Sequence, residues 1–560
     1  MSSGCRPGDH TTERAALLRR LAAEGVDVAV IGGGINGAGI ARAAALRGYS
    51  VLLVEKEDYG WGTTWRSTKL IHGGLRYLEH GEVGLVFESL RDRARLLAEY
   101  PGMVRPLRFL LPVFERDRHG PAAIGVGLTA YDALSFRLRG PRLPWHRRLS
   151  VRDALFQEPS LRSTGLRSAF TYFDCQAAYP ERLCFQTIAE AEAAGACALN
   201  HALAERLLVR DARVRGLSVH DKLAHESIDV PARLVINAAG PWVDEVLRRV
   251  DHLPRHIGGT KGVHIVVDFH GRGPRHALYA EARADHRPFF VIPWRGRHLV
   301  GTTDTRFAGD PDSVRAEPDD IAYLVREVQW LLPVCGFGED DVLYAYAGVR
   351  PLPHTGDGAE GAITRRHHIV DHARSGFDGL FSIVGGKLST FRSLAAQVEQ
   401  RIETRLGRPA GTPTRLPHAQ HDARQDAAAG VSRAIVRYLG TLYGPRRGLV
   451  LRFVREAPER LQPLCPHGPD VEGQVQFAAR YEQARTLSDA LLRRTGAGWN
   501  PCLALDCVGR AAQLMAQELG WDAARTDAAV ADYVADLRRT FSSRAFAPLD
   551  AGAPATGRAL

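Results

Sequence analysis

The chain has 560 residues, 45% of them hydrophobic and 24% charged, a composition that excludes wholesale disorder and predicts two or more folded domains. Its formal net charge is +10, which favours anionic partners. Only five of the basic residues are lysines, however, and the excess of arginine is spread evenly along the sequence. We interpret this excess of arginine as a compositional bias of the genome and expect no nucleic-acid partner.

The cysteines and the apolar runs restrict the chain further. Its eight cysteines include no CxxC pair, so we expect reduced, mostly structural thiols, no disulfide framework and no metal site. No stretch approaches the roughly 18 apolar residues that span a bilayer. Residues 1–25 form a polar leader without a secretory pattern. If the protein meets a membrane, we expect it to lie on the membrane surface.

The first regular elements predict one βαβ unit. Residues 26–31 indicate a buried parallel strand, residues 35–46 a helix and residues 50–55 a second strand. Strand and helix signals then alternate to about residue 410, where a cluster of Pro and Gly indicates a linker. The strand candidates in this region are residues 233–240, 263–269, 288–294, 298–304 and 380–386.

The last part of the chain, residues 411–545, predicts a helical domain, and residues 546–560 have the composition of a flexible tail. Asp522 is well placed to cap a helix. One face of that helix is apolar at helical spacing, with Val530, Tyr533, Val534 and Leu537.

Three glycines follow the first strand in the spacing GxGxxG, at Gly32, Gly34 and Gly37. Such glycines permit a tight turn, close approach of the backbone to a pyrophosphate, and close packing of helix on strand. The N-terminus of the next helix offers N–H groups and a positive dipole end to phosphates. Glu55 ends the second strand, where a carboxylate can accept from ribose hydroxyls. The unit therefore predicts a dinucleotide site, without choosing between NAD and FAD.

The stretch after Glu55, dense in Gly, Thr, Ser and Arg, favours FAD. From here the sequence resembles the FAD-dependent (respiratory) glycerol-3-phosphate dehydrogenases, part of the amino-acid-oxidase-like flavoprotein group. The segments that carry the resemblance stand in that family's order and read IGGGINGAGIA, STKLIHGGLRYLEHG, NAAGPWVD, KGVHIVV, GTTDT, GVRPL, AITR and GGKLSTFR. One departure is YGWGTTWRS, where Trp61, Trp65 and Arg66 are bulkier than the family pattern.

The resemblance implies an α/β fold with a Rossmann-like FAD-binding domain over residues 26–410. That domain is interleaved with a mixed-sheet substrate domain, roughly residues 80–180 and 250–360, and is followed by the C-terminal α-helical domain. The cofactor is then FAD. The residues implied to contact it are Gly32, Gly34, Asn36, Gly37, Glu55, Ser67, Thr68, Lys69, His72, Gly73, Ala239, Gly240, Gly386, Lys387, Leu388 and Ser389.

Glycerol 3-phosphate is the implied substrate, and guanidinium groups bind its phosphate bidentately. Arg365 could exchange its role with the adjacent Arg366. We expect Arg350 and His264 to be catalytic, His264 as the base because its ordinary pKa of about 6.5 suits proton uptake near neutrality. The residues expected to bind substrate are Arg76, Tyr77, Thr302, Arg350, Arg365 and Lys387.

The resemblance also implies a membrane quinone as electron acceptor, and hence a cytoplasmic enzyme held peripherally on the inner face of the cell membrane. Residues 135–150, rich in Arg with Phe136 and Trp145, are compatible with anionic headgroups or with an ordinary basic loop. Three alternatives stay open: an oxidase that reduces oxygen to peroxide, a flavoprotein acting on tRNA, and oxidation of another anion. A homodimer is also left open.

Overall fold

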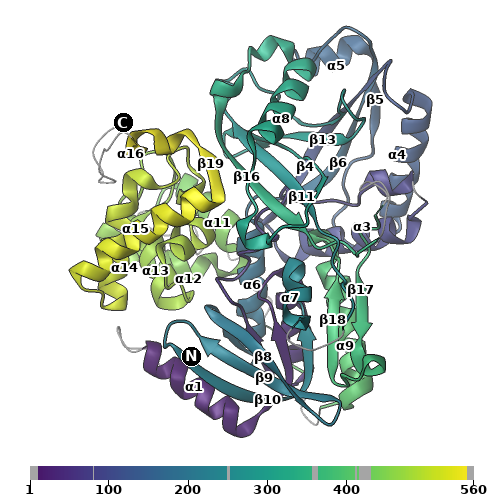
Figure 1. The fold of residues 1–560 in the computed structure, drawn as a ribbon. Coiled ribbons are helices and arrows are strands. Elements are labelled where there is room, and N and C mark those ends of the chain that lie inside the picture. The colour runs from purple at the N-terminus through teal and green to yellow at the C-terminus, as the bar shows by residue number, and fades with distance from the viewer. Residues whose placement is uncertain are drawn as a thin grey trace.

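The computed structural model describes residues 10–79, 81–248, 253–355, 363–409, 413–414, 416 and 431–550. Its elements form three parts: a sheet domain with α1 and α9 (bottom in Figure 1), a second sheet domain with α4 and α8 (upper right), and a helical C-terminal domain (yellow) beside both. Most of the predicted linker and most of the predicted tail lie outside the described residues.

The first sheet has a parallel centre in the order β18-β10-β1-β2-β7, with β17 antiparallel at its edge. The central strand β1 is buried except at Asp27, and β2 is a fully buried apolar run, as coverage of both faces of the sheet requires. The predicted βαβ unit is confirmed within one or two residues at each end. The strands are β1 (Val26–Ile31), β2 (Val51–Val54), β7 (Cys197–Leu199), β8 (Ala202–Arg210), β9 (Arg213–Asp221), β10 (Glu226–Asn237), β17 (His368–Asp371) and β18 (Leu380–Val384).

Within the described residues, five helices pack around this sheet. The polar leader contains a helix, α1, whose Leu18 and Leu21 are buried against the sheet. Arg14 of α1 also forms a 2.6 Å ion pair with the buried Asp221, so this segment is part of the domain. The helices are α1 (His10–Glu24), α2 (Ile35–Arg47), α6 (Pro180–Ala193), α7 (Val243–Leu247) and α9 (Phe391–Leu406).

The second sheet runs in the order β19-β16-β11-β14-β13-β12-β4-β6-β3 and is antiparallel except between β12 and β4. Its strands come from three separate stretches of the chain, residues 70–177, 260–350 and 541–543, and the first two alternate along the chain with the strands of the first sheet, which confirms the predicted interleaving. They are β3 (Leu70–Ile71), β4 (Val104–Phe114), β5 (Arg147–Leu149), β6 (Leu166–Ala177), β11 (Thr260–Val267), β12 (Ala277–Glu281), β13 (Pro288–Trp294), β14 (Arg297–Gly301), β15 (Thr305–Arg306), β16 (Val342–Arg350) and β19 (Phe541–Ser543).

Four helices belong to this second domain: α3 (Val83–Glu99), α4 (Pro121–Phe136), α5 (Val151–Gln157) and α8 (Pro318–Leu331). Helix α8 lies on β11 and buries Leu324, Val328 and Leu331. Among the helices of the described ranges, none is both long and apolar enough to cross a membrane.

The C-terminal domain is helical, as predicted. Asp522 caps α15, its carboxylate accepting from Arg525 N at 2.7 Å, and Tyr533 and Leu537 are buried on the expected face. The chain then returns as β19 to pair with β16, which joins this domain to the second sheet. Its helices are α11 (Arg433–Tyr443), α12 (Arg447–Arg455), α13 (Glu472–Tyr481), α14 (Val508–Leu519), α15 (Ala523–Thr540) and α16 (Ala547–Asp550), with a π-helix at Asp489–Arg494.

An aromatic cluster ties the three domains together. Trp65, from the loop after β2, packs against Tyr346, Trp499 and Phe541 at ring-centroid distances of 5.4, 5.2 and 5.7 Å. Trp65 therefore faces the C-terminal domain. This packing explains one of the bulky side chains at positions where the family pattern has small ones. This cluster fixes the position of the loop that follows β2.

Candidate active site

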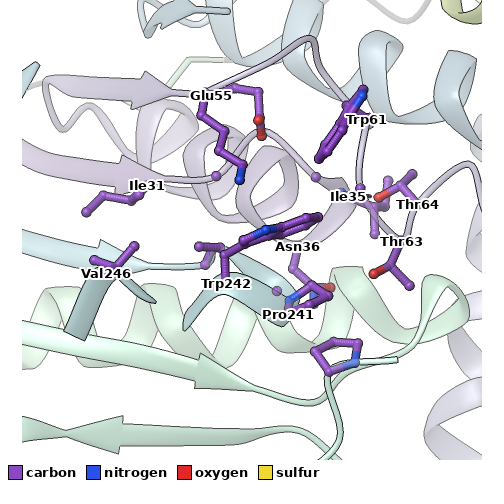
Figure 2. Close-up of a pocket in the computed structure, with 18 of the residues that line it drawn as sticks. Ile31, Ile35, Asn36, Glu55, Trp61, Thr63, Thr64, Pro241, Trp242 and Val246 are labelled. Atoms are coloured by element: carbon purple, nitrogen blue, oxygen red, sulfur yellow. Dashed lines mark hydrogen bonds between the residues drawn. The ribbon is translucent and has the colours of Figure 1, made fainter. Parts of the chain in front are cut away.

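The first cleft lies at the carboxyl ends of β1 and β10, beside the N-terminus of α2, and encloses about 1090 Å³. Figure 2 shows Ile31, Glu55 and Trp242 reaching it from different elements. In open α/β sheets, nucleotides bind at this end of the strands. The expected cofactor residues that line it are Gly32, Gly34, Asn36, Glu55, Ser67, Ala239, Gly240, Gly386, Lys387 and Leu388.

At two glycines of the GxGxxG motif, neighbouring main-chain atoms leave no room for a side chain. Gly32 has φ +107°, and a Cβ there would lie 2.7 Å from the carbonyl oxygen of Ala238. A Cβ at Gly37 would lie 1.9 Å from the carbonyl oxygen of Gly32, so any side chain would push α2 away from the turn. Gly37 thus supports the cleft from behind and does not line it. The glycines leave backbone, rather than side chains, facing the ligand.

Two polar side chains of the cleft fit a dinucleotide. The carboxylate of Glu55 accepts from Gly33 N at 2.7 Å and from Glu57 N at 3.0 Å. Burial raises its pKa despite these bonds. The Oδ1 of Asn36 is buried without a hydrogen-bond partner among the described residues, which leaves an acceptor for a ligand donor. The glycine cradle, the helix end and these two groups together fit FAD.

Two tryptophans cover one side of this cleft. Trp61 and Trp242 pack at a centroid distance of 5.4 Å, and Lys56 Nζ lies 4.5 Å from the Trp242 ring centre (Figure 2). Lys56 in turn forms a 2.9 Å ion pair with Asp312. Trp61, a departure from the family pattern, is therefore a wall of the cofactor cleft.

A second cleft opens directly beside the first and encloses about 1470 Å³. Ser67, Gly386 and Lys387 line both, so a ligand of one cleft can touch a ligand of the other. The expected residues that line the second cleft are Ser67, Thr68, His72, Arg76, Tyr77, Thr302, Arg350, Arg365, Gly386, Lys387, Leu388 and Ser389.

Three arginines of the second cleft converge on one carboxylate, Asp304. Arg350 Nη1 donates to it at 3.0 Å, Arg365 Nη2 at 2.9 Å, and Arg287 Nη1 lies 3.6 Å away. Burial alone would raise the pKa of Asp304, but Arg350 and Arg365 hold it below its usual value. Arg287 also forms a 3.4 Å ion pair with Asp285, so three guanidinium groups face two carboxylates and leave a net positive cluster that suits an anion.

Arg350 is held from a second side by the loop after β14. Its Nη2 donates to Thr302 Oγ1 at 2.9 Å and to the carbonyl oxygen of Thr303 at 3.1 Å. These bonds fix the plane of the guanidinium. Arg365 has 14% of its side chain exposed, whereas Arg366 is exposed. Arg365 therefore lines the second cleft, whereas Arg366 does not.

Lys387 stands where the two clefts meet. Its Nζ donates to Ser89 Oγ at 3.1 Å and lies 4.5 Å from the ring centre of Tyr77. Burial lowers the pKa of Lys387 to about 7. A bound anion would favour the protonated form, because an opposite charge raises the pKa of an amine.

His264 lies behind the second cleft rather than in its wall. Its Nε2 is 2.9 Å from Thr68 Oγ1, and its ring stacks on Tyr346 at 5.3 Å. Burial, together with the charges of Arg350 and Lys69, holds the pKa of His264 well below its ordinary value. Thr68 thus stands between His264 and any ligand of the cleft.

Two further expected cofactor residues also lie outside both linings. Lys69 is buried with its Nζ 4.1 Å from the ring centre of Trp499 and donates to the carbonyl oxygen of Trp65 at 3.1 Å. The N–H of Gly73 donates to Tyr131 Oη at 2.8 Å, and a Cβ there would meet that ring. The neighbouring Gly74 lines the second cleft instead.

Sequence reasoning missed several residues of the two linings. Asp304 lies within the segment GTTDT and Trp242 within NAAGPWVD. Both could therefore have been predicted from the segments that carry the family resemblance. Arg287 lies in a stretch, ADHRPFF, that carries no motif. Its part in the charge cluster follows only from the pairing of β13 with β14.

Comparison with known proteins identifies the family of the chain. Residues 27–390 match the FAD dependent oxidoreductase family, and residues 381–526 match the C-terminal domain of alpha-glycerophosphate oxidase. The chain is 39% identical to a glycerol-3-phosphate dehydrogenase of Synechocystis, over 84% of this chain and 88% of that protein. It is 36% identical to an aerobic glycerol-3-phosphate dehydrogenase of Staphylococcus haemolyticus, over 69% of each.

A solved structure agrees over nearly the whole chain. It is the glycerol-3-phosphate dehydrogenase of Bacillus halodurans complexed with FAD, with a TM-score of 0.76 and 28% identity, over 94% of this chain and 97% of that one. The cradle of the first cleft fits the same cofactor. The chain therefore belongs to the FAD-dependent glycerol-3-phosphate dehydrogenase and oxidase family.

Proposed function

We propose that this protein oxidises sn-glycerol 3-phosphate to dihydroxyacetone phosphate. The observation that carries the proposal is the cluster of Arg287, Arg350 and Arg365 around Asp304, next to the cofactor cleft. A phosphate dianion can bind these guanidinium groups with Lys387 completing the charge balance. The glyceryl carbons then extend toward Ser67 and Gly386, where the clefts meet.

The bound FAD supplies the hydride acceptor, and the chain's own residues orient the substrate and take its hydroxyl proton. Phosphate binding provides the positioning energy, since it is remote from the reacting carbon. Thr68 Oγ1 would accept the hydroxyl proton of the substrate while the proton of Thr68 itself passes to His264 Nε2, 2.9 Å behind it. A dianion beside Arg350 offsets one of the charges that disfavour protonated His264.

Anaerobic mixing of the FAD-loaded protein with substrate tests this proposal. Glycerol 3-phosphate should bleach the flavin absorbance, while glycerol, which lacks the phosphate, and lactate, a 2-hydroxy acid, should not. Bleaching by lactate alone would contradict the assignment of the phosphate cluster. Retention of the oxidised spectrum with all three would reject the substrate while leaving the cofactor in place.

We further propose that the electrons pass to a membrane quinone, with the enzyme lying on the cytoplasmic face of the membrane. Helix α4 supports this proposal: of its 16 residues only Leu128 and Tyr131 are buried, and Val126 and Phe136 are 72% and 53% exposed. Trp145 packs on Phe136 at 6.3 Å. The exposed basic side chains beside this apolar face are Arg137, Arg139, Arg142, Arg147 and Arg148. Such a combination suits anionic headgroups.

Co-sedimentation with anionic phospholipid vesicles tests the membrane step. Val126→Glu and Trp145→Glu should release the protein, whereas Val334→Glu, at an equally exposed valine away from α4 (66% exposed), should not. Turnover with a soluble quinone, compared with peroxide yield in air, then separates a dehydrogenase from an oxidase. Peroxide formation matching substrate consumption, with no quinone reduction, would favour the oxidase.

A further inference from the structure

Two loops of the C-terminal domain carry its three cysteines together with a histidine and an aspartate, far from either cleft in sequence. The first loop precedes α13 and reads CPHG, with Cys465 and His467. The second precedes α14 and reads CLALDC, with Cys502, Asp506 and Cys507. Nothing in the proposed reaction uses these five residues.

Two of the thiols lie at van der Waals distance. Cys465 Sγ lies 3.7 Å from Cys502 Sγ, and Cys507, which is buried like Cys465, ends the second loop. Four ligands around a tetrahedral zinc ion with Zn–S bonds near 2.3 Å place neighbouring sulfur atoms about 3.8 Å apart. The spacing of the first pair thus matches two ligands of one metal ion, and it is too long for a disulfide.

A histidine and a carboxylate complete the group. Ligand atoms of His467, Cys502 and Asp506 all lie within 4.8 Å of one another. His467 Nε2 also makes a 2.7 Å contact with Asp506 Oδ2, which leaves Nδ1 for a metal. A metal-bound histidine typically donates its other N–H to such a carboxylate. Asp506 is therefore positioned to orient the imidazole of His467 without binding the metal itself.

The protein around these loops is shaped to hold sulfur. The side-chain Nδ2 of Asn500, two residues before Cys502, is buried without a hydrogen-bond partner among the described residues, which leaves a donor for a thiolate. Leu503 and Ala504, between the second pair of cysteines, have φ of +49° and +60°, a conformation that non-glycine residues adopt only when other contacts impose it. Cys465 and Cys507 are 2% and 4% exposed, whereas His467 lies at the surface.

We propose that Cys465, Cys502, Cys507 and His467 bind a structural zinc ion, with Asp506 positioning His467. Borderline-soft zinc takes three thiolates and one imidazole in closed tetrahedral sites. The absence of a CxxC pair hid the site from the sequence, because its cysteines are split between loops 37 residues apart.

The site has a definite structural task. Trp499 precedes Asn500 and Cys502 in the second loop and packs on Trp65 at 5.2 Å and on Trp294 at 5.3 Å. Asn500 Oδ1 also accepts from Arg295 Nη2 at 2.8 Å. A metal ion that ties the two loops would fix this contact between the C-terminal domain and both sheet domains.

Metal analysis of the full-length, FAD-loaded protein, purified without a polyhistidine tag from zinc-supplemented cells, tests the proposal. We expect one zinc per chain, and its loss in Cys465→Ser and Cys507→Ser. The matched control Cys197→Ser replaces a half-exposed thiol in β7 and should keep the metal. Asp506→Asn should weaken zinc binding roughly 10- to 100-fold in a chelator competition.

A measurement on the unmodified chain covers the case that the serine variants do not fold. Cobalt added in place of zinc should give the long-wavelength bands of a tetrahedral thiolate complex, beyond the absorbance of oxidised flavin. Wild-type protein that carries neither zinc nor cobalt would overturn the proposal. So would a Cys465–Cys502 disulfide found by mass spectrometry of the alkylated chain, or iron with acid-labile sulfide in place of zinc.

Discussion

The two clefts meet at Gly386 and Lys387 but are built in opposite ways. The cofactor cleft is shaped by main chain, because Gly32 and Gly37 leave no room for a Cβ. The substrate cleft is shaped by charge, with side chains from β16, the loops beside β13 and β14, and the segment before β17 meeting at Asp304. A short local motif shapes the glycine turn of the first cleft, although distant residues such as Trp242 and Gly386 complete its lining. The charge cluster of the second cleft, in contrast, exists only after distant segments have folded together.

This difference predicts different responses to substitution. Steric closure of a backbone cradle acts as an all-or-none block, since neighbouring main chain cannot move aside cheaply. Removal of one charge from a cluster leaves the others in place and gives a graded loss. Measurements on each cleft can therefore break or sharpen the comparison.

The largest effect is expected for Gly37→Ala in the cofactor cleft. A Cβ at this position would lie 1.9 Å from the Gly32 carbonyl oxygen, so the turn must open and FAD should be lost on purification, together with all activity. The flavin-to-protein absorbance ratio measures this directly. Gly84→Ala, where a Cβ meets nothing within 4 Å, should keep both. Full FAD content in Gly37→Ala would show that the cradle is less rigid than its geometry indicates.

The next largest effect is expected for Arg350→Ala in the substrate cleft. Truncating a largely buried charged partner costs about 3–4 kcal/mol, or roughly 100- to 1000-fold in kcat/KM. The flavin should remain bound, because Arg350 does not line the cofactor cleft. Steady-state kinetics with an artificial acceptor measure the loss. A variant that also loses FAD would contradict the separation of the two clefts.

A smaller effect distinguishes Arg365 from its neighbour. Arg365→Ala removes one of three guanidinium groups on Asp304 and should raise KM roughly tenfold, about 1.4 kcal/mol. Arg366→Ala, at an exposed side chain, should leave KM within about twofold. The reverse order would place Arg366 on the phosphate and overturn the charge cluster as the substrate site.

The pH dependence of substrate capture follows from Lys387. Its pKa is lowered to about 7 in the protein without substrate, so it loses its charge as the pH rises through neutrality. Because a phosphate dianion pairs with the ammonium form, kcat/KM should fall above about pH 7, while kcat falls less. Lys387→Met should have lower kcat/KM at pH 6.5 and no decline above 7. A decline that persists in this variant belongs to another group.

The fold could be predicted from the sequence because its signals are local. The glycine spacing and the apolar runs located β1, α2 and β2, and Asp522 and Tyr533 marked α15. The position of Lys69 could not be predicted, since it stands in a motif whose neighbours line the clefts while its own side chain turns the other way. Arg287 and the convergence of the cysteines depend on pairings between segments that no local pattern records.

The smallest effect is expected for Lys69→Met. This variant tests whether Lys69 contacts the cofactor, as its motif implies, or faces away from both clefts, as the structure shows. Burial lowers the pKa of Lys69 to about 8, and its Nζ lies 4.1 and 5.1 Å from the ring centres of Trp499 and Trp294. Methionine fills similar space among aromatic rings, so the flavin spectrum and KM should stay within about twofold. A shifted flavin spectrum would instead place Lys69 at the cofactor, as the family motif implies. Because the side chain faces the C-terminal domain, its removal should register in the melting temperature before it registers in catalysis.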